Sequence, residues 1–331
     1  MKKLLVTSAL AGSLLVSASA FAEMKMKGYL ETTLGSGETP SAAPVTNQGT
    51  SIGYETGVTF SGSKELDNGM SMGVKATLED TAFLGQAVSF SSEGTTLFIG
   101  NDFHGLDDKQ TVPVVANTIE DGNKGLGVSY NNNAGTIHSK SGVGLMNKSD
   151  FGTVAAYYVP KVGASVDGGD SKPSGQKKSG SGTAFGFQGG LGVEGLGVNA
   201  FRTVKHTQGL STQEITMTGY GVKYNFGSIT AGAQRTSIDD ANLAEEYTVG
   251  SEAKYTSYGA TWAATDTLSV GVQIGETDLT DQDDKEEIMS ITAGYNLGGQ
   301  VVSIQLTDVE NADTVKGNDG AAIELRIKSS F

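Results

Sequence analysis

Apolar and polar residues alternate along most of the chain after residue 22. In the clearest case, residues 268–275 (LSVGVQIG), one face would carry only aliphatic side chains and the other only small or polar ones. Because successive side chains of a β-strand point to opposite faces, this period of two predicts strands. The same division recurs in 52–60, 70–79, 289–295 and 302–306.

The alternation predicts sixteen strands and an all-β fold. They fall at 24–34, 51–63, 70–80, 84–91, 95–101, 125–131, 150–160, 183–193, 196–205, 213–226, 228–237, 252–264, 267–277, 286–297, 299–309 and 320–331. A single strand of this kind fits a soluble antiparallel sheet with one buried face equally well. The number and spacing of the strands favour a transmembrane antiparallel β-barrel instead.

The connections between these strands alternate in length. Tight turns are predicted at 64–69, 92–94, 194–195, 227, 265–266 and 298, whereas 35–50, 102–124, 161–182, 206–212, 238–251, 278–285 and 310–319 are longer and polar. Short turns on one side and long loops on the other are typical of outer-membrane barrels. Two connections depart from this rule: 81–83 is short, and 132–149 is long enough to hold another hairpin, which leaves eighteen strands as an alternative.

Aromatic residues gather at the strand ends beside the short turns, where a ring favours the membrane interface. These residues are Phe60, Phe90, Phe226, Trp262, Tyr295 and Phe331. Aromatics scattered through a core are the alternative interpretation. A strand of about ten residues, tilted by about 40°, spans roughly 25 Å, which matches the apolar band of such a barrel.

The first 22 residues have the pattern of a secretion signal. Lys2 and Lys3 precede an apolar stretch, and Ala20-Phe21-Ala22 forms a small-x-small cleavage site. A buried helix or membrane anchor is the alternative, but the apolar run is too short to cross a bilayer. We therefore expect a signal peptide over 1–22, export, and one outer-membrane barrel domain over 23–331. No later stretch has 18 consecutive apolar residues, which excludes a transmembrane helix there.

Composition narrows the functional classes. The chain has no cysteine, and loss of Lys2 and Lys3 with the leader takes the formal net charge from −14 to −16. Nucleic acid is therefore not expected as a partner. Only His104, His138 and His206 occur, far apart, so we expect no catalytic site, no metal site and no cofactor. The letters GLGVEG at 190–195 match a dinucleotide fingerprint, but they lie between two strands with no helix behind them.

Three segments stand out: EMKMKGYLETTLG at 23–35, TTLFIGNDFHGLDDKQTVPVVANTIEDG at 95–122 and GAAIELRIKSSF at 320–331. Together they resemble the trimeric general-diffusion porins of Gram-negative bacteria. The start of the mature chain, EMKMKGYLETTLG, is similar to their first strand. The end, GAAIELRIKSSF, is similar to their closing strand and assembly signal, although Ser329 departs from the usual pattern. In TTLFIGNDFHGLDDKQTVPVVANTIEDG, a strand ending at Gly100 would lead into their long third loop, which folds into the barrel; Asn101 stands where a basic residue is common.

The resemblance implies a homotrimer in the outer membrane of a Gram-negative bacterium, in contact with membrane lipid and lipopolysaccharide. It also implies a constriction formed by acidic loop groups facing basic wall groups. The loop candidates are Asp102, Asp107, Asp108, Lys109, Glu120 and Asp121. By alternation the wall candidates that point inward are Lys27, Lys75, Lys223 and Arg326, together with Lys328, Glu31, Glu55, Glu79 and Glu324. The facing of Arg202 and Arg235 stays open.

These observations predict a water-filled channel for passive diffusion of ions and small hydrophilic solutes, with a constriction near 102–122. The acidic loop and the net charge favour cations. A barrel selective for one sugar or metabolite is one alternative. A structural or adhesin barrel without conductance is a second, and a secreted soluble β-protein is a third.

Overall fold

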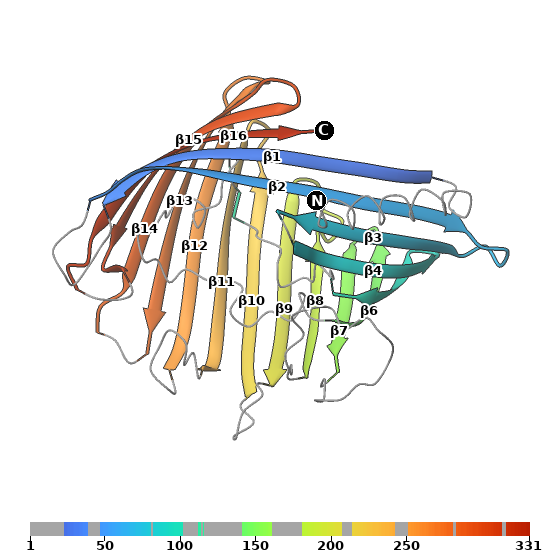
Figure 1. The fold of residues 1–331 in the computed structure, drawn as a ribbon. Helices are drawn as coiled ribbons and strands as arrows, with labels where there is room; N and C mark the ends of the chain where they lie inside the picture. Colours follow the sequence, from blue (N-terminus) through green and yellow to red (C-terminus); the bar gives the residue numbers. More distant parts are fainter. Residues whose placement is uncertain are drawn as a thin grey trace.

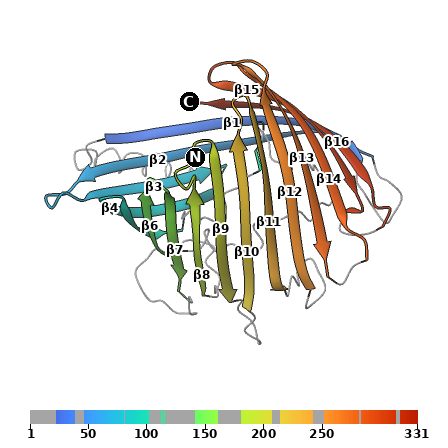
Figure 2. The same ribbon diagram turned by 180° about the vertical axis from the view of Figure 1, so that it is seen from behind.

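The computed structural model describes residues 23–38, 47–80, 82–101, 112–113, 115, 141–160, 181–206, 214–241, 251–280, 283–312 and 316–331. These residues form one closed barrel of sixteen antiparallel strands (Figure 1). Each strand pairs with its neighbours in sequence, and the first closes on the last. Seen from behind, the wall is again continuous from β6 to β14 (Figure 2). None of the helices within the described ranges is long and apolar enough to cross a membrane.

The first eight strands are β1 (Glu23–Glu38), β2 (Asn47–Glu65), β3 (Ser71–Glu79), β4 (Ala82–Ser92), β5 (Thr95–Gly100), β6 (Gly142–Ser149), β7 (Gly152–Val159) and β8 (Gly182–Gly189). The second eight are β9 (Leu196–His206), β10 (Glu214–Asn225), β11 (Ile229–Ala241), β12 (Ser251–Ala263), β13 (Leu268–Leu279), β14 (Glu286–Asn296), β15 (Gln300–Glu310) and β16 (Gly320–Ser330).

The predicted fold class and the number of sixteen strands are confirmed, so the alternative of eighteen is wrong for the wall. One predicted strand is also wrong. The sixth position in the wall is taken by β6 and not by 125–131, which lie outside the described residues. A tight turn at Asp150 and Phe151 joins β6 to β7, so the long connection becomes 101–141. This shift removes one of the two breaks in the alternation of turns and loops; the short connection between β3 and β4 remains.

The two faces of the wall have opposite chemistry. On the outer face aliphatic side chains are exposed, with Ile274 at 48% and Ile304 at 44% of their surface accessible. On the inner face polar side chains are buried, with Ser290 and Gln305 each at 1%. In water such a continuous apolar outer surface would aggregate, whereas in a bilayer it meets lipid tails. This inversion contradicts the alternative of a soluble β-protein.

Aromatic side chains lie on the outer face near the short turns. Phe226, Trp262 and Tyr295 expose 65%, 53% and 46% of their surface there, and the terminal Phe331 exposes 71%. Trp262 and Tyr295 come from β12 and β14, Phe226 directly follows β10, and Phe331 follows β16. A ring at this height can contact both the acyl chains and the headgroups. The predicted girdle beside the short turns is therefore present on these strands.

Candidate functional site

The interior wall is lined mainly by uncharged polar side chains. Thirteen such residues are buried on the inner face of the described wall: Thr33, Asn199, Thr203, Gln234, Thr236, Ser257, Gln273, Thr277, Ser290, Thr292, Ser303, Gln305 and Thr307. Some bind one another across strands, as where the Gln305 amide donates to the Ser290 hydroxyl at 2.7 Å. Hydrogen-bonded polar side chains of this kind suit an interior in contact with water.

A short part of the connection between β5 and β6 lies against the opposite inner wall. The Gln273 side-chain amide on β13 donates to the carbonyl of Pro113 at 3.1 Å. Val112 faces Gly259 on β12 and Val115 faces Gly271 on β13; Cβ atoms at these glycines would come within 2.6 and 2.9 Å of the two valine side chains. Both valines are buried. The absence of side chains at the two glycines therefore allows the segment to approach the wall closely.

This contact places residues 112–115 across the interior from where their connection starts. Gly100 at the end of β5 pairs with Gly142 at the start of β6, so the connection leaves and returns at adjacent strands. In the ring, β12 is seven strands away from β5. Val112, Pro113 and Val115 therefore lie against the inner wall far from the two strands that their connection joins. The inner wall at β12 and β13 is thus a docking site for this connection.

Charged side chains gather on the inner face at the seam between β1 and β16. Glu31 is 2% exposed and forms ion pairs with Arg326 and with Lys328, whose ammonium lies 3.3 Å from the carboxylate. The Lys328 ammonium also lies over the Tyr29 ring, 4.5 Å from its centroid. The Tyr29 hydroxyl in turn donates to Glu55 on β2. The seam is therefore closed by electrostatic contacts in addition to backbone hydrogen bonds.

A cavity of about 340 Å³ lies on the inner side of β1 to β5, nearer the short turns. Two cationic side chains, Lys25 and Lys75, line it together with the hydroxyls of Ser61, Ser63 and Ser89. Phe98 contributes an aromatic surface from β5. No carboxylate is among its described lining residues. The wall here is locally positive although the chain as a whole is acidic.

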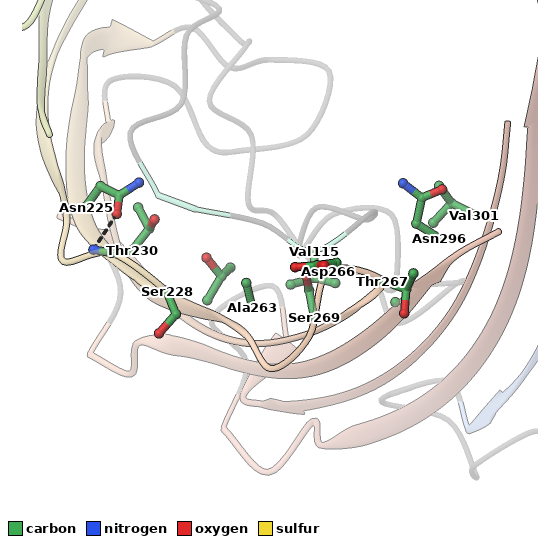
Figure 3. Close-up of a pocket in the computed structure, with 13 residues that line it drawn as sticks. Val115, Asn225, Ser228, Thr230, Ala263, Asp266, Thr267, Ser269, Asn296 and Val301 are labelled. Carbon is green, nitrogen blue, oxygen red and sulfur yellow. Dashed lines mark hydrogen bonds between the residues drawn. The ribbon is translucent and has the colours of Figure 1, made fainter. Parts of the chain in front are cut away.

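A second cavity, of about 440 Å³, lies beneath Val115 at the short-turn end of β10 to β15 (Figure 3). Its surface is largely polar, with Asn225, Thr230, Ser269 and Asn296 in the wall. The Asn225 side chain accepts a hydrogen bond from the amide of Gly227 at 2.8 Å, which fixes the turn after β10. Water can therefore occupy the space between Val115 and the short turns.

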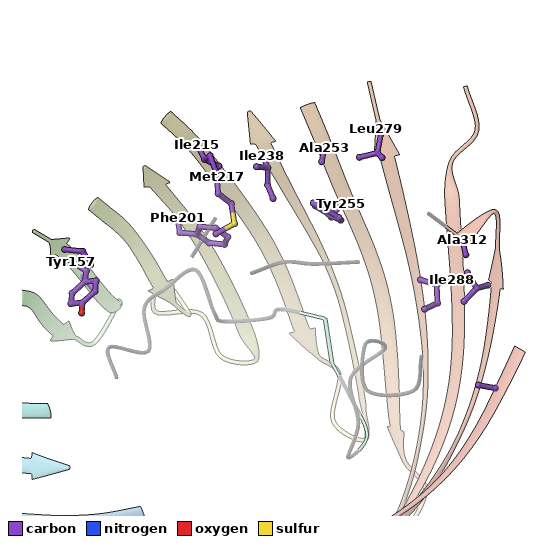
Figure 4. Close-up of a cluster of buried hydrophobic side chains, with 14 residues drawn as sticks. Tyr157, Phe201, Ile215, Met217, Ile238, Ala253, Tyr255, Leu279, Ile288 and Ala312 are labelled. Atoms are coloured by element: carbon purple, nitrogen blue, oxygen red, sulfur yellow. The ribbon is translucent and has the colours of Figure 1, made fainter. Parts of the chain in front are cut away.

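Part of the inner face is apolar, which the alternation pattern alone did not predict. A cluster of buried side chains, including Phe201, Met217, Ile238 and Tyr255, extends from β7 to β16 (Figure 4). Met217 and Ile238 have no accessible surface. Along each strand these residues also occupy every second position, but on the face opposite to the outward aliphatic residues. Only the pairing register between strands shows that they face inward.

The predicted loop residues Asp102, Asp107, Asp108, Lys109, Glu120 and Asp121 all lie outside the described residues. The four wall candidates all lie in strands, so the strand pairing shows which face of the wall each side chain occupies. Lys27 is in the same row as Thr59, Lys75 lines the cavity with Lys25, and Arg326 binds Glu31. Lys223 lies over the inward glycine Gly197, where a Cβ would come 2.9 Å from the lysine side chain. Arg326, Lys27 and Lys75 lie on the neighbouring strands β16, β1 and β3, whereas Lys223 on β10 lies far from them.

Arg202 and Arg235, whose facing the sequence left open, lie on the outer face. Arg202 pairs with Thr218, and Arg235 pairs with the exposed Tyr220. They therefore cannot contribute to the inner wall. Among the described residues, no group of three or more His, Asp or Glu side chains could hold a metal ion.

Comparison with known proteins gives a consistent result. The sequence model of the family described as Gram-negative porin matches residues 7–314. Among solved structures, the anion-selective porin from Comamonas acidovorans is similar, with a TM-score of 0.67 and 14% identity over 93% of this chain and 99% of that one. OmpT of Vibrio cholerae is similar at a TM-score of 0.66 and 13% identity, covering 93% and 97% of the two chains.

A variant of the porin from Rh. blastica is also similar, with a TM-score of 0.61 and 16% identity over 93% of this chain and the whole of that one. Because the sequence identities to these solved structures are low, the similarity shows a shared fold and no more. A search of curated proteins found no match.

Proposed function

The chain belongs to the Gram-negative porin family, and we propose that residues 102–122 form the constriction of its channel. The family and its barrel establish an outer-membrane channel for passive diffusion, and they indicate a channel rather than an enzyme. The observation that carries the proposal is the hydrogen bond from the Gln273 side chain to the Pro113 carbonyl, on the wall opposite β5. A connection that crosses the interior reduces the cross-section open to solutes.

Acidic groups of this loop would face basic groups of the wall and set the ion preference. The loop offers Asp102, Asp107, Asp108, Glu120 and Asp121 against the single cation Lys109. On the wall, Lys27, Lys75, Lys223 and Arg326 would provide the opposing charges. Fixed charges at the narrowest point of a pore act at close range on every passing ion. The acidic excess in the loop supports a preference for cations, although the similar porin from Comamonas acidovorans is described as anion-selective.

Single-channel recording of the purified protein in planar bilayers tests this function. We expect stepwise ohmic conductance, and a reversal potential across a potassium chloride gradient that has the sign of cation preference. Absence of conductance would contradict the channel, and a reversal potential of the opposite sign would contradict the assignment of the loop. Saturable block by one sugar or metabolite would instead favour a substrate-selective channel.

We also propose that residues 1–22 are a signal peptide that is removed on export, that 23–331 form one barrel domain, and that the protein is a homotrimer. The trimer is supported by the family and by the shortness of β5. Six residues, rising about 3.3 Å each at a tilt near 40°, reach only roughly 15 Å, less than the apolar band of about 25 Å. A neighbouring subunit would shield this part of the wall from lipid. Native mass spectrometry checks the subunit number.

A further inference from the structure

Two of the three arginines of the chain lie on the surface that faces lipid. Arg202 on β9 and Arg235 on β11 are exposed on the outer face, while the third, Arg326, faces the interior. Within the described part of the chain, neither outer guanidinium makes an ion pair or a hydrogen bond with another residue. Charged residues in contact with a membrane are expensive and normally bind a partner. These two positions therefore call for a ligand outside the chain.

The two arginines are close enough to bind one headgroup. Arg202 pairs with Thr218 on β10, and Arg235 pairs with Tyr220 on the same strand, two residues further along. Two strand spacings and an offset of two residues give a Cα separation of roughly 12 Å. Thr218 on β10 lies beside Arg202, and Ser237 follows in the same row on β11, two residues from Arg235; both add hydroxyl groups. We call Arg202, Thr218, Arg235 and Ser237 the arginine patch.

The height of the arginine patch indicates what it contacts. Counted from the short-turn end of its strand, each arginine is the fourth side chain that points outward. On β9, for example, Leu196, Val198 and Ala200 precede Arg202. It therefore starts roughly 15 Å above that end, within an apolar band of about 25 Å. A long arginine side chain can keep its stem among acyl chains while its guanidinium reaches the headgroups. The side away from the short turns is the long-loop side, which faces the outer leaflet.

The patch is distinct from the neighbouring outer wall. On β13, four outward aliphatic residues precede the first charge, and that charge is acidic, at Glu276. The same row continues through Glu287 on β14 and Glu310 on β15. The surface thus changes from basic to acidic across a few strands. An anionic headgroup is attracted more to the two arginines than to this acidic row; Asp239 on β11 and Glu214 on β10 also face outward, but four residues nearer the long loops.

We propose that the arginine patch binds the phosphate groups of a phosphorylated outer-leaflet glycolipid. A guanidinium presents several N–H donors in a planar fork that matches phosphate oxygens, which lysine cannot reproduce. The small outward side chains below the patch, Ala200, Ala231 and Ala233, leave room for acyl chains against the wall. The binding energy then comes from phosphate contacts and acyl-chain packing together. This site does not depend on conduction or on the position of the loop.

The test measures lipid binding to the full-length mature protein in detergent micelles. Native mass spectrometry and thermal unfolding are followed while lipid A with intact phosphates, phosphatase-treated lipid A or inorganic phosphate is added. The variant is R202Q/R235Q, and the matched control is K64Q, which removes an exposed outward cation at the short-turn end of β2. The charge-conserving variant R202K/R235K is measured in parallel. Heat-modifiable migration shows that each variant has folded.

For the wild type we expect binding of intact lipid A that is at least tenfold tighter than in R202Q/R235Q, with K64Q unchanged and R202K/R235K intermediate. Phosphatase-treated lipid A should lose this difference, and inorganic phosphate alone should not stabilise the protein. Equal binding by R202Q/R235Q and the wild type would overturn the proposal. It would also be overturned if inorganic phosphate bound as well as the lipid, or if the variant changed the subunit number and not lipid binding, because the patch would then be a subunit interface.

Discussion

Gly28 and Phe331 bind each other at the seam where the barrel closes. The amide of Gly28 donates to the carbonyl of Phe331 at 2.8 Å, and the amide of Phe331 donates to the carbonyl of Gly28 at 3.0 Å. The Phe331 ring lies against Gly28, where a Cβ would overlap it. The glycine of the first strand and the terminal aromatic residue lie in the two end segments that resemble the porin family, and they form one contact.

This contact predicts that both residues are needed for closure. We expect Gly28→Val to displace the ring and Phe331→Ala to remove it, and each variant should fold into lipid more slowly and with a lower yield. Heat-modifiable migration on a gel measures the folded fraction over time. Phe226→Ala is the matched control, because Phe226 is a similarly exposed outward ring that does not lie at the seam. Equal folding yields for Phe331→Ala and Phe226→Ala would contradict the role of the seam.

The hydrogen bond between Gln273 and Pro113 predicts how the segment that contains Val112, Pro113 and Val115 responds to mutation. Gln273→Ala removes one hydrogen bond, worth about 1 kcal/mol, and should increase current noise and mean conductance as the segment moves more freely. Gly271→Leu should displace Val115 from the wall and lower the conductance. Gln188→Ala, an inward glutamine on β8, is the control. If all three variants had wild-type conductance and noise, residues 112–115 would not restrict the channel.

The strand number could be predicted from the sequence because a period of two recurs in nearly every wall segment. The position of the sixth strand could not. Residues 125–131 place Leu126, Val128 and Tyr130 on one face, whereas β6 has only Val143 and Leu145 outward before Asn147. By alternation alone, 125–131 is the better strand. The correct choice depends on pairing with β5 and β7, which is a property of the closed ring and not of either segment.

The interior could be predicted only in part, for a related reason. Lys75 and Arg326 alternate with aliphatic neighbours, so their inward facing follows from the pattern. On β9, however, Phe201 faces inward and Arg202 outward, the reverse of what polarity suggests. The inner apolar cluster around Met217 reverses the pattern in the same way. Where the interior is partly filled by protein, side-chain polarity no longer indicates which face is which.

The Glu31 ion pairs predict a large loss of stability when one partner is removed. Arg326→Leu leaves a buried carboxylate with less compensation, and we expect it to cost about 3–5 kcal/mol. Glu31→Leu combined with Arg326→Leu should cost much less, because the buried carboxylate is removed as well and Lys328, which loses this ion pair, is 42% exposed to solvent. Urea unfolding from lipid vesicles gives the free energies for a double-mutant cycle. A cycle with additive effects would show that the two side chains do not stabilise each other.

The cavity lined by Lys25 and Lys75 predicts a local effect on ion selectivity. Both lysines are on the inner wall, so Lys75→Glu changes the fixed charge beside the water path by two units. We expect the reversal potential across a potassium chloride gradient to move toward cations, and to move further when Lys25→Glu is added. Lys64→Glu makes the same charge change on the outer face of β2, and it should leave the reversal potential unchanged because that side chain does not face the water path. If Lys64→Glu shifted the potential as much as Lys75→Glu, selectivity would follow net charge and not the charges that line the interior.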